Sequence, residues 1–192
     1  MTDSRWTRRA LLATGAAGGV AGLAGCFGQT AVPEPVAIAE DQTCENCNMI
    51  IARHPGPVAQ AYYLDDAPSA LADREDGHGR FCSTWCHYKF VFEMKDRDHT
   101  PVGSYATDYS AVEYQIGETS GTLVIDPSPH LGADSFSRAE SLSFVVDSDV
   151  EGAMGESLIG FGDETDATDF TDEYGGEVLA ESEITPELIS AL

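Results

Sequence analysis

Two halves of the chain show the same succession of apolar and polar patterns. In the first half, apolar stretches rich in β-branched and aromatic residues predict two strands, and a helix and a third strand follow. These elements are expected at residues 49–53, 58–64, 83–94 and 103–107. The second half repeats this order, with elements expected at 141–147, 157–161, from 163 onward and at 177–180. The pattern therefore predicts an α+β fold built from two small β-β-α-β units packed together.

The first unit is expected to span residues 43–110 and the second to span residues 111–192. Near their junction, stretches 112–116 and 122–125 predict two further strands with a glycine-containing turn between them. The charged stretch 65–80 and the stretch 127–138 are expected to be loops.

The first expected helix carries a clear start signal. Ser83 or Thr84 can cap it, and its aromatic residues recur on one face at positions 85, 88 and 92. Cys86 would then lie in the first turn, where the helix dipole is expected to lower the pKa of its thiol. The neighbouring His87 points about 100° away from Cys86 on a helix, so it is not expected to share a metal with that cysteine.

The chain is strongly acidic. Ten Lys and Arg residues stand against 33 Asp and Glu residues, which gives a formal net charge of −23. Such a surface repels phosphate backbones and anionic lipid headgroups, so nucleic-acid binding is excluded. A distributed acidic excess keeps proteins soluble in very high salt, where self-repulsion is screened, and the composition is therefore typical of an extreme halophile.

The N-terminus has the character of an export signal. Arg8 and Arg9 precede an apolar, glycine-rich run, as in a twin-arginine signal, and the run is shorter than the ~20 residues that span a bilayer. It ends in Leu23-Ala24-Gly25-Cys26, which resembles a lipoprotein cleavage box, so Cys26 would become the first mature residue and carry the lipid. An uncleaved anchor helix is the alternative.

Both interpretations place the body of the protein outside the cytoplasmic membrane. Residues 1–25 are then the signal peptide, and residues 26–42, which contain Pro33 and Pro35, are expected to be a tether between the membrane and the folded body.

The most concentrated chemistry lies in Cys44-Glu45-Asn46-Cys47-Asn48-Met49. Two thiols and a thioether fall close together, and soft sulfur donors select Cu(I). Zinc accepts thiolates but makes little use of a thioether, so Met49 shifts the expectation from zinc toward copper. The alternatives are a disulfide between Cys44 and Cys47, and Met49 as an ordinary core residue.

Cys82 and Cys86 leave a second interpretation open. With Cys26 lipidated, four cysteines remain in the body, and an even number outside the cell invites disulfides. The same four cysteines, with Cys44 and Cys47 as one half, could instead form a zinc site. The sequence does not choose among the disulfide pairings, the zinc site and a copper site shared by all four.

One methionine in the second half is a candidate for a further soft ligand. Met154 lies between two expected strands, with Gly152 and Gly155 close on either side. This position is poor for core packing. Met154 therefore either donates its thioether to the segment Cys47–Met49 or is an incidental surface residue.

The pattern Cys-x-x-Cys-x-Met-Ile after a lipoprotein tether, followed by Gly56-Pro57-x-Ala59-Gln60, resembles the NosL family of nitrous oxide reductase accessory proteins. The segments around Met154 and around Tyr174-Gly175-Gly176 resemble the second half of the same family. The resemblance implies a membrane-tethered, extracytoplasmic Cu(I) chaperone, not an enzyme, that delivers copper to nitrous oxide reductase or its assembly machinery. It also implies paired β-β-α-β units similar to the core of the organomercurial lyase.

The resemblance carries the copper ligands onto Cys47 and Met49, with Cys44 in support. Asn48 stands where the family usually has glycine, but Asn tolerates a left-handed backbone better than other residues, so the turn is expected to survive. Cys82 and Cys86 are not part of the resemblance. They keep two other classes of function in view, which are a structural zinc module for interactions and a thiol–disulfide oxidoreductase.

Overall fold

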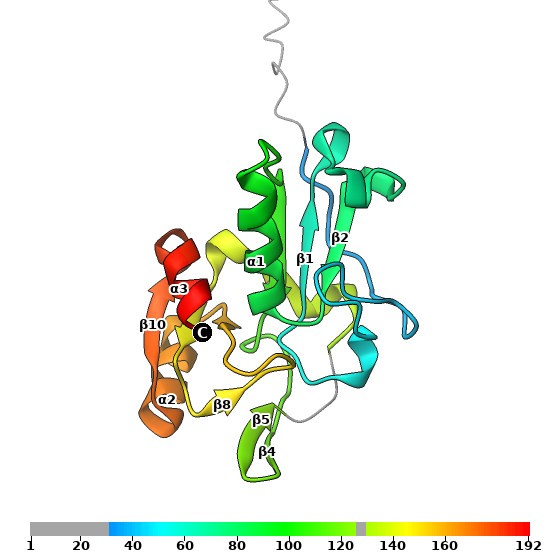
Figure 1. Ribbon diagram of the computed structural model, residues 1–192. Coiled ribbons are helices and arrows are strands. Elements are labelled where there is room, and N and C mark those ends of the chain that lie inside the picture. Colours follow the sequence, from blue (N-terminus) through cyan, green and yellow to red (C-terminus); the bar gives the residue numbers. More distant parts are fainter. Residues whose placement is uncertain (1–30, 126–129) are drawn as a thin grey trace, which may run out of the picture.

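The first unit is a four-stranded antiparallel sheet with one long helix beside it. The computed structural model describes residues 31–125 and 130–192. The elements of this unit are β1 (Ala59–Tyr62), β2 (His78–Phe81), α1 (Thr84–Lys95), β3 (Gly103–Thr107) and β6 (Phe136–Arg138), with strand order β2-β1-β3-β6. Figure 1 shows α1 running alongside β1 and β2. The run β1-β2-α1-β3 is the predicted β-β-α-β order.

The second unit is a three-stranded sheet with the same connectivity. Its elements are β7 (Ser143–Val146), β9 (Ile159–Phe161), α2 (Glu164–Tyr174) and β10 (Glu177–Ala180), with strand order β10-β7-β9. In each unit the first strand is central and pairs antiparallel with both the second and the third. The α+β class and the paired β-β-α-β units are therefore confirmed.

The two units also match in register. Ala59 on the central strand of the first unit lies opposite Phe81 on one side and Ala106 on the other. Ser143 holds the same place in the second unit, between Phe161 and Ala180. Phe81 and Phe161 are thus equivalent residues. The sequence halves show little likeness because sheet register constrains burial and backbone pairing more than residue identity.

The remaining elements form a small third sheet and short connections. They are β4 (Ile116–Thr119), β5 (Thr122–Ile125), β8 (Val150–Glu151) and α3 (Pro186–Ala191), with the sheet order β4-β5-β8. The β4–β5 hairpin projects from the bottom of the molecule in Figure 1. Single 3₁₀ turns lie at Ile51–Arg53, Leu64–Asp66, Ser69–Leu71, Glu75–Gly77, Ala133–Ser135, Ala139–Ser141 and Glu181–Glu183. The C-terminal α3 packs on α1, where the indole of Trp85 donates to the carbonyl of Ile189 at 2.9 Å.

Aromatic residues fill the two cores. In the first unit Phe81 and Phe90 pack with ring centroids 5.2 Å apart, and in the second unit Phe161 and Phe170 pack at 5.3 Å. Tyr88 on α1 meets a ring of the second unit, Phe144, edge to face at 5.9 Å. Such pairs add to the stabilisation from apolar burial, and this last one joins α1 to the central strand of the other unit.

Four of the sequence predictions for strands and loops are wrong. Residues 51–53 form a 3₁₀ turn where a strand was expected, and residues 78–81 form β2 where a loop was expected. The hydrophobic pattern did not indicate β2, because this strand contains a histidine, a glycine and an arginine. The histidine is nonetheless buried, since His78 Nε2 lies 2.8 Å from Gln60 Oε1. The expected loop 127–138 also contains β6, and the expected strand 112–116 lies instead at 116–119.

A buried carboxylate joins the two units. Asp108 Oδ1 accepts from the backbone N–H groups of Gly162, at 2.8 Å, and Ser110, at 3.0 Å. Its Oδ2 accepts from the hydroxyl of Ser137 at 2.8 Å. A parallel bridge between Asp108 and Gly160 continues the contact from the end of β3 to β9. Three donors from three segments therefore meet at the Asp108 side chain.

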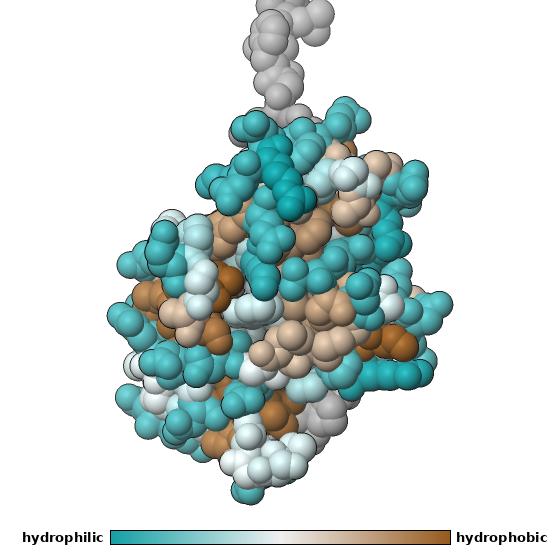
Figure 2. Space-filling view, in the orientation of Figure 1, coloured by the Kyte–Doolittle hydropathy of each residue, from teal (hydrophilic) through white to brown (hydrophobic). Residues whose placement is uncertain are grey.

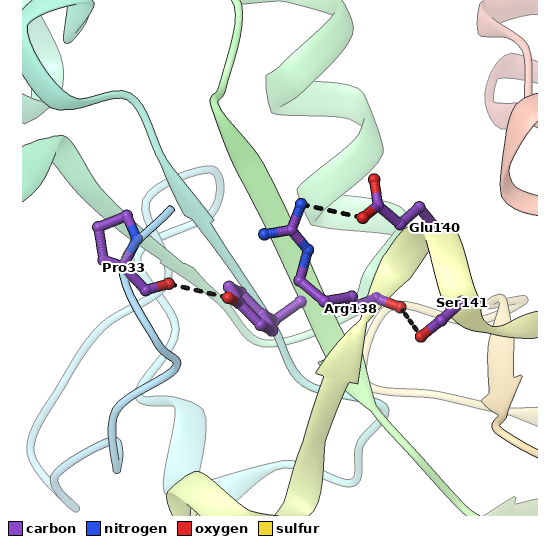
Figure 3. Close-up of polar contacts among 5 residues, drawn as sticks. Pro33, Arg138, Glu140 and Ser141 are labelled. Atoms are coloured by element: carbon purple, nitrogen blue, oxygen red, sulfur yellow. Dashed lines mark hydrogen bonds and ion pairs between the residues drawn. The ribbon is translucent and has the colours of Figure 1, made fainter. Parts of the chain in front are cut away.

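Part of the expected tether belongs to the folded body. The carbonyl of Pro33 accepts from the hydroxyl of Tyr105 on β3 at 2.8 Å, as seen at the left of Figure 3. The guanidinium of Arg138 on the adjacent β6 lies over the Tyr105 ring and pairs with Glu140 at 3.1 Å (Figure 3). Further along, Gln60 exchanges hydrogen bonds with the backbone of Val36. The boundary expected at residue 42 is therefore too late, because the chain already packs on the sheet from Pro33.

Hydrophilic residues cover most of the face shown in Figure 2, and apolar residues gather there in separate patches. Within residues 31–125 and 130–192, no helix has the length and apolar character needed to cross a bilayer. Arg8, Arg9 and Cys26, on which the export and lipidation predictions depend, lie outside the described residues.

Candidate metal centre

The first half of the centre is a tight hairpin that carries Cys44, Cys47 and Met49. The N–H of Cys44 donates to the carbonyl of Met49, and the N–H of Asn48 donates to the carbonyl of Cys44, both at 2.9 Å. Asn48 turns the chain with φ of 62°, in the left-handed region. Asn is among the few non-glycine residues that tolerate this region, so the prediction that the turn survives without glycine is confirmed.

The second half of the centre is the N-terminus of α1. Ser83 caps the helix, because its hydroxyl accepts from the N–H of Cys86 at 3.0 Å. Cys82 immediately precedes this cap and Cys86 lies in the first turn, as the sequence predicted. The hairpin is attached next to it, since the N–H of Glu45 donates to the carbonyl of Arg80 on β2 at 2.9 Å.

These two halves bring four sulfur atoms together. The Sγ atoms of Cys44, Cys47, Cys82 and Cys86 all lie within 4.8 Å of one another. The Cys47–Cys82 separation is 3.5 Å and the Cys82–Cys86 separation is 3.8 Å. All four are free thiols. We call these four side chains the thiol cluster. The sequence analysis offered this four-cysteine set only as one alternative. No local feature of a sequence indicates that residues about 40 positions apart lie close together in the fold.

Exposure differs within the thiol cluster. Cys44, Cys82 and Cys86 are buried, whereas Cys47 is partly exposed. The side-chain amide of Asn46 donates to Cys86 Sγ at 3.4 Å, which closes the cluster from the hairpin side. Cys47 is therefore the thiol through which the cluster meets solvent.

The pKa values of Cys44, Cys82 and Cys86 are shifted in different directions. Hydrogen bonds from the side chains of Cys82 and Cys86, together with the backbone N–H of Cys82, lower the pKa of Cys44 to about 2. The same interaction with Cys44 raises the pKa of Cys82 and raises that of Cys86 to about 12. The pKa of Cys86 is therefore raised and not lowered as the sequence predicted, and the hydrogen bond with Cys44 is the largest cause. The cluster thus holds one thiolate readily, and a metal would displace the remaining protons.

Met49 and Met154 occupy different settings. Met49 is partly buried in the hairpin. Met154 is 39% exposed, in a turn closed by the backbone bridge between Gly152 and Gly155. The turn packs against the loop that follows the hairpin, since a Cβ at Gly152 would meet the Gly56 carbonyl at 2.8 Å. The structure therefore places the Met154 turn against the first unit.

Thr84, which the sequence analysis treated only as a cap candidate, connects this turn region to the thiol cluster. Its hydroxyl lies 2.9 Å from the Ser157 hydroxyl and donates to the carbonyl of Leu158 at 2.7 Å. Thr84 is fully buried and stands between Cys82 and Cys86 in the chain. A threonine next to a cap residue is common, so no sequence signal distinguished this contact.

The neighbouring histidine makes contacts elsewhere. His87 Nε2 lies 2.9 Å from the Ser104 hydroxyl, and burial lowers its pKa to about 3. The centre is therefore one of sulfur ligands, assembled on a hairpin and a helix N-terminus. Soft sulfur ligands of this kind bind Cu(I), zinc or iron.

An α+β scaffold of two equivalent units with one sulfur-rich centre defines a class of metal-binding protein. Comparison with known proteins gives its family. The NosL family model matches residues 35–189, so the chain belongs to the NosL family.

Two relatives support the assignment. The copper-binding lipoprotein NosL of Stutzerimonas stutzeri is 30% identical over 171 residues, which cover 88% of this chain and 76% of that protein. The crystal structure of the copper chaperone NosL from Shewanella denitrificans is 26% identical, with a TM-score of 0.62 over 81% of this chain and 98% of that chain. The predicted family is confirmed. So is the prediction that the protein is not an enzyme, because these relatives are a copper-binding lipoprotein and a copper chaperone.

Proposed function

We propose that this protein is a membrane-tethered, extracytoplasmic Cu(I) chaperone that supplies copper for the maturation of nitrous oxide reductase. One observation carries the proposal. Cys47 is the partly exposed member of a thiol cluster that is otherwise buried, and Met49 lies two residues further along the same hairpin. A thiolate and a thioether at the surface suit capture of a soft ion from a donor and its release to a partner.

Copper would enter and leave through Cys47 and Met49, with Cys44 close behind them. Transfer between proteins proceeds by exchange of one ligand at a time, so at least one donor must detach easily. Met154 fits this role, because it is an exposed, neutral thioether on a short turn. Gly155 lies at φ of 93° with open space around it, whereas Gly152 packs tightly against the Gly56 carbonyl. The turn is thus tightly packed at Gly152 and unobstructed at Gly155.

The location is proposed from the N-terminus. Arg8 and Arg9 would direct export, and Cys26 would carry the lipid that holds the body at the outer face of the cell membrane. The description of the Stutzerimonas stutzeri relative as a lipoprotein supports this assignment. The link to nitrous oxide reductase is supported by membership of the NosL family.

The copper site is tested by titrating Cu(I) against a competing chelator. The double variant Cys47→Ala, Met49→Ala should bind Cu(I) at least tenfold more weakly than the wild type. Met94→Leu is the matched control, because it also removes a thioether but lies eight residues along α1 from Cys86, about 12 Å away. Unchanged affinity in the double variant would overturn the assignment of these ligands.

Delivery is tested with copper-free nitrous oxide reductase as the recipient. The loaded wild type should transfer copper and restore activity faster than free Cu(I) at an equal concentration. Met154→Leu should bind Cu(I) slightly more weakly and change the transfer rate. Equal affinities and rates for Met154→Leu and wild type would reduce Met154 to a surface residue.

A further inference from the structure

We propose that the face of the first sheet opposite α1 is a peptide-binding surface. In this chain its own residues 33–38 fill the surface, and the same segment binds there when a second molecule supplies it. We call residues 33–38 the strap and this side of the sheet the strap face. In Figure 1 the strap lies in the blue segment that runs beside β1 and β2. The inference does not rest on the proposed copper transfer, because the strap and the strap face contain none of the proposed copper ligands.

The two faces of the first sheet carry different kinds of side chain. On one face Phe81 packs against Phe90 of α1, and the hydroxyl of Ser104 lies within hydrogen-bond distance of His87 of α1. Because side chains alternate along each strand, the residues next to these point to the opposite face. Polar and aromatic residues on that opposite face are Gln60, Tyr62, His78, Arg80, Tyr105 and Arg138. All of them except the two arginines are buried. Buried polar side chains of this kind are unusual in a core and are expected where a surface binds a ligand.

The strap meets this face through its backbone. The carbonyl of Pro33 accepts from the hydroxyl of Tyr105 at 2.8 Å (Figure 3), and the carbonyl of Glu34 accepts from the hydroxyl of Tyr62 at 3.1 Å. Gln60 exchanges two hydrogen bonds with the backbone two residues further along the strap, at 2.9 and 3.3 Å. Three side chains of the sheet thus bind peptide groups of an extended segment, as peptide-recognition surfaces do.

The side chains of the strap contribute little to this contact. Glu34, Val36 and Ala37 are exposed, and the exposed fraction of Val36 is 43%. Ile38, at the end of the strap, is its one buried residue, and its N–H donates to the carbonyl of Leu131 at 2.9 Å. A segment with few buried apolar contacts can open locally while the rest of the molecule stays folded. The strap is therefore able to leave the strap face without unfolding the sheet.

One polar group on the strap face is left without a partner. Within the part of the chain that the structure describes, the buried Nε of Arg80 has no hydrogen-bond acceptor. Arg80 lies opposite Gln60 in the register of β1 and β2, so it adjoins a residue that binds the strap. A buried donor without an acceptor is costly, and packing alone gives no reason to keep one. The strap therefore does not use the full binding capacity of this face.

The composition of the strap suits an extended bound segment. Pro33 and Pro35 restrict φ and have no N–H that would be left unpaired, so little conformational entropy is lost on binding. The strap is covalently attached to the body, which gives it a high effective concentration at the strap face. The same segment from a second molecule is therefore expected to bind weakly until the attached strap is loosened.

Binding from a second molecule is tested with a fluorescent peptide that has the sequence of residues 31–39. The protein is the mature chain, residues 26–192, and fluorescence polarisation gives the affinity. Ile38→Asp removes the buried anchor of the attached strap and leaves the strap face intact. This variant should bind the peptide at least about tenfold more tightly than the wild type, because the attached competitor is weakened. Equal affinities of Ile38→Asp and wild type would overturn the proposal.

The role of the strap face is tested in the Ile38→Asp background. Adding Tyr62→Phe and Tyr105→Phe removes two hydroxyl donors and keeps both rings, so the gain in peptide affinity should be lost. Tyr174→Phe is the matched control, because it removes a hydroxyl from α2 of the second unit and should keep the gain. Peptide binding that survives the loss of both donor hydroxyls would show that the peptide binds elsewhere, and would reject the strap face as the site.

A further measurement uses the wild type and does not depend on the folding of any variant. Hydrogen exchange is followed at the N–H groups of Val36 and Ile38, which donate to Gln60 and Leu131. Both should be protected in the free protein, and an excess of unlabelled peptide should reduce this protection by displacing the strap. The amides of β1 should remain protected and serve as the internal reference. Protection unchanged at saturating peptide would show a permanently attached strap, and no protection in the free protein would show an undocked one; either result would refute the proposal.

Discussion

The two β-β-α-β units use the same structural position for different purposes. The residue after Phe81, at the end of the second strand, is Cys82, and its backbone N–H is one of the groups that lower the pKa of the Cys44 thiol. The residue after Phe161 is Gly162, and its backbone N–H donates to the carboxylate of Asp108 at 2.8 Å. Each junction between strand and helix thus binds an anionic acceptor from elsewhere in the chain.

Helix N-termini favour such acceptors because their N–H groups are unpaired and their dipole is positive. In the first unit the acceptor is a sulfur, and the junction residue supplies a thiol of its own. In the second unit the acceptor is a carboxylate that joins the two units. One backbone geometry thus lies at the candidate metal centre in one copy and joins the two units in the other. Four predictions test this division.

The largest effect is expected at Asp108. Asp108→Ala removes the acceptor for Gly162, Ser110 and Ser137, and should reduce the free energy of unfolding by roughly 3 kcal/mol, because these donors lose a charged partner. Asp108→Asn keeps an acceptor oxygen and should cost less. Urea denaturation measures both. Asp172→Ala, on the exposed side of α2, is the control and should change stability little; an equal loss there would contradict the role of Asp108.

Gly162 should come next. A Cβ at this position would meet Asp108 Oδ2 at 2.5 Å, and that carboxylate is held by hydrogen bonds on both oxygens. Gly162→Ala should therefore cost about 1–3 kcal/mol through overpacking. Gly117→Ala is the matched control, since nothing lies within 4 Å of its Cβ position. In the double variant with Asp108→Ala the two losses should be less than additive, and strict additivity would show that the residues are not coupled.

The two helix caps give a smaller contrast. Ser83 is fully buried, and Ser83→Ala should cost about 1–2 kcal/mol because the N–H of Cys86 loses its acceptor. Asp163 is exposed, and Asp163→Ala should lower the Tm less. Hydrogen bonding to the Thr165 backbone lowers the pKa of Asp163, so its contribution is present above the ordinary value of 3.8 and is lost as pH falls further. A larger Tm loss at Asp163 than at Ser83 would reverse the comparison.

The smallest effect concerns pH. His78 in β2 lies three residues before Phe81, and the equivalent residue before Phe161 is Leu158. Burial, with Arg80 and Arg74 nearby, lowers the pKa of His78 to about 3 from 6.5. The unfolded chain therefore binds more protons between these values, and stability should fall as pH drops from 7 to 5. His78→Gln should remove a fraction of one proton from this dependence, measured as a shallower change in urea midpoint with pH. An unchanged slope would show that His78 does not titrate differently on unfolding.

The sequence predicted the local features of the fold and site well. The Ser83 cap, the turn at Asn48 and the helices α1 and α2 depend on neighbouring residues, so periodicity and turn chemistry reveal them. The strand β2 was missed because His78 and Arg80 are polar residues of a kind expected in a loop. Their burial depends on Gln60 and other distant partners. The structural equivalence of the two units could not be detected from residue identities for a similar reason, since the units match only in strand register.

The membership of the metal centre was predictable only in part. Cys44, Cys47 and Met49 are close in sequence, so their soft-donor chemistry is plain. Cys82 and Cys86 join them because Glu45 pairs with the backbone of Arg80, which brings the hairpin to the start of α1. Contacts between residues about 40 positions apart have no local signature in the sequence. The role of Thr84 in holding Leu158 was hidden for the same reason.

The docking of Pro33 on β3 sets how far the protein can travel. With Cys26 lipidated as proposed, only seven residues link the lipid to the folded body, a span of at most about 25 Å. A tether ending at residue 42 would have reached about 58 Å. Because the lipid anchor diffuses laterally, the shorter tether thins the layer that the body can reach by roughly twofold, which raises its effective concentration toward partners anchored in the same membrane by a similar factor. Copper exchange would therefore be confined to a thin layer next to the bilayer, and a freely diffusing recipient must enter that layer to be served.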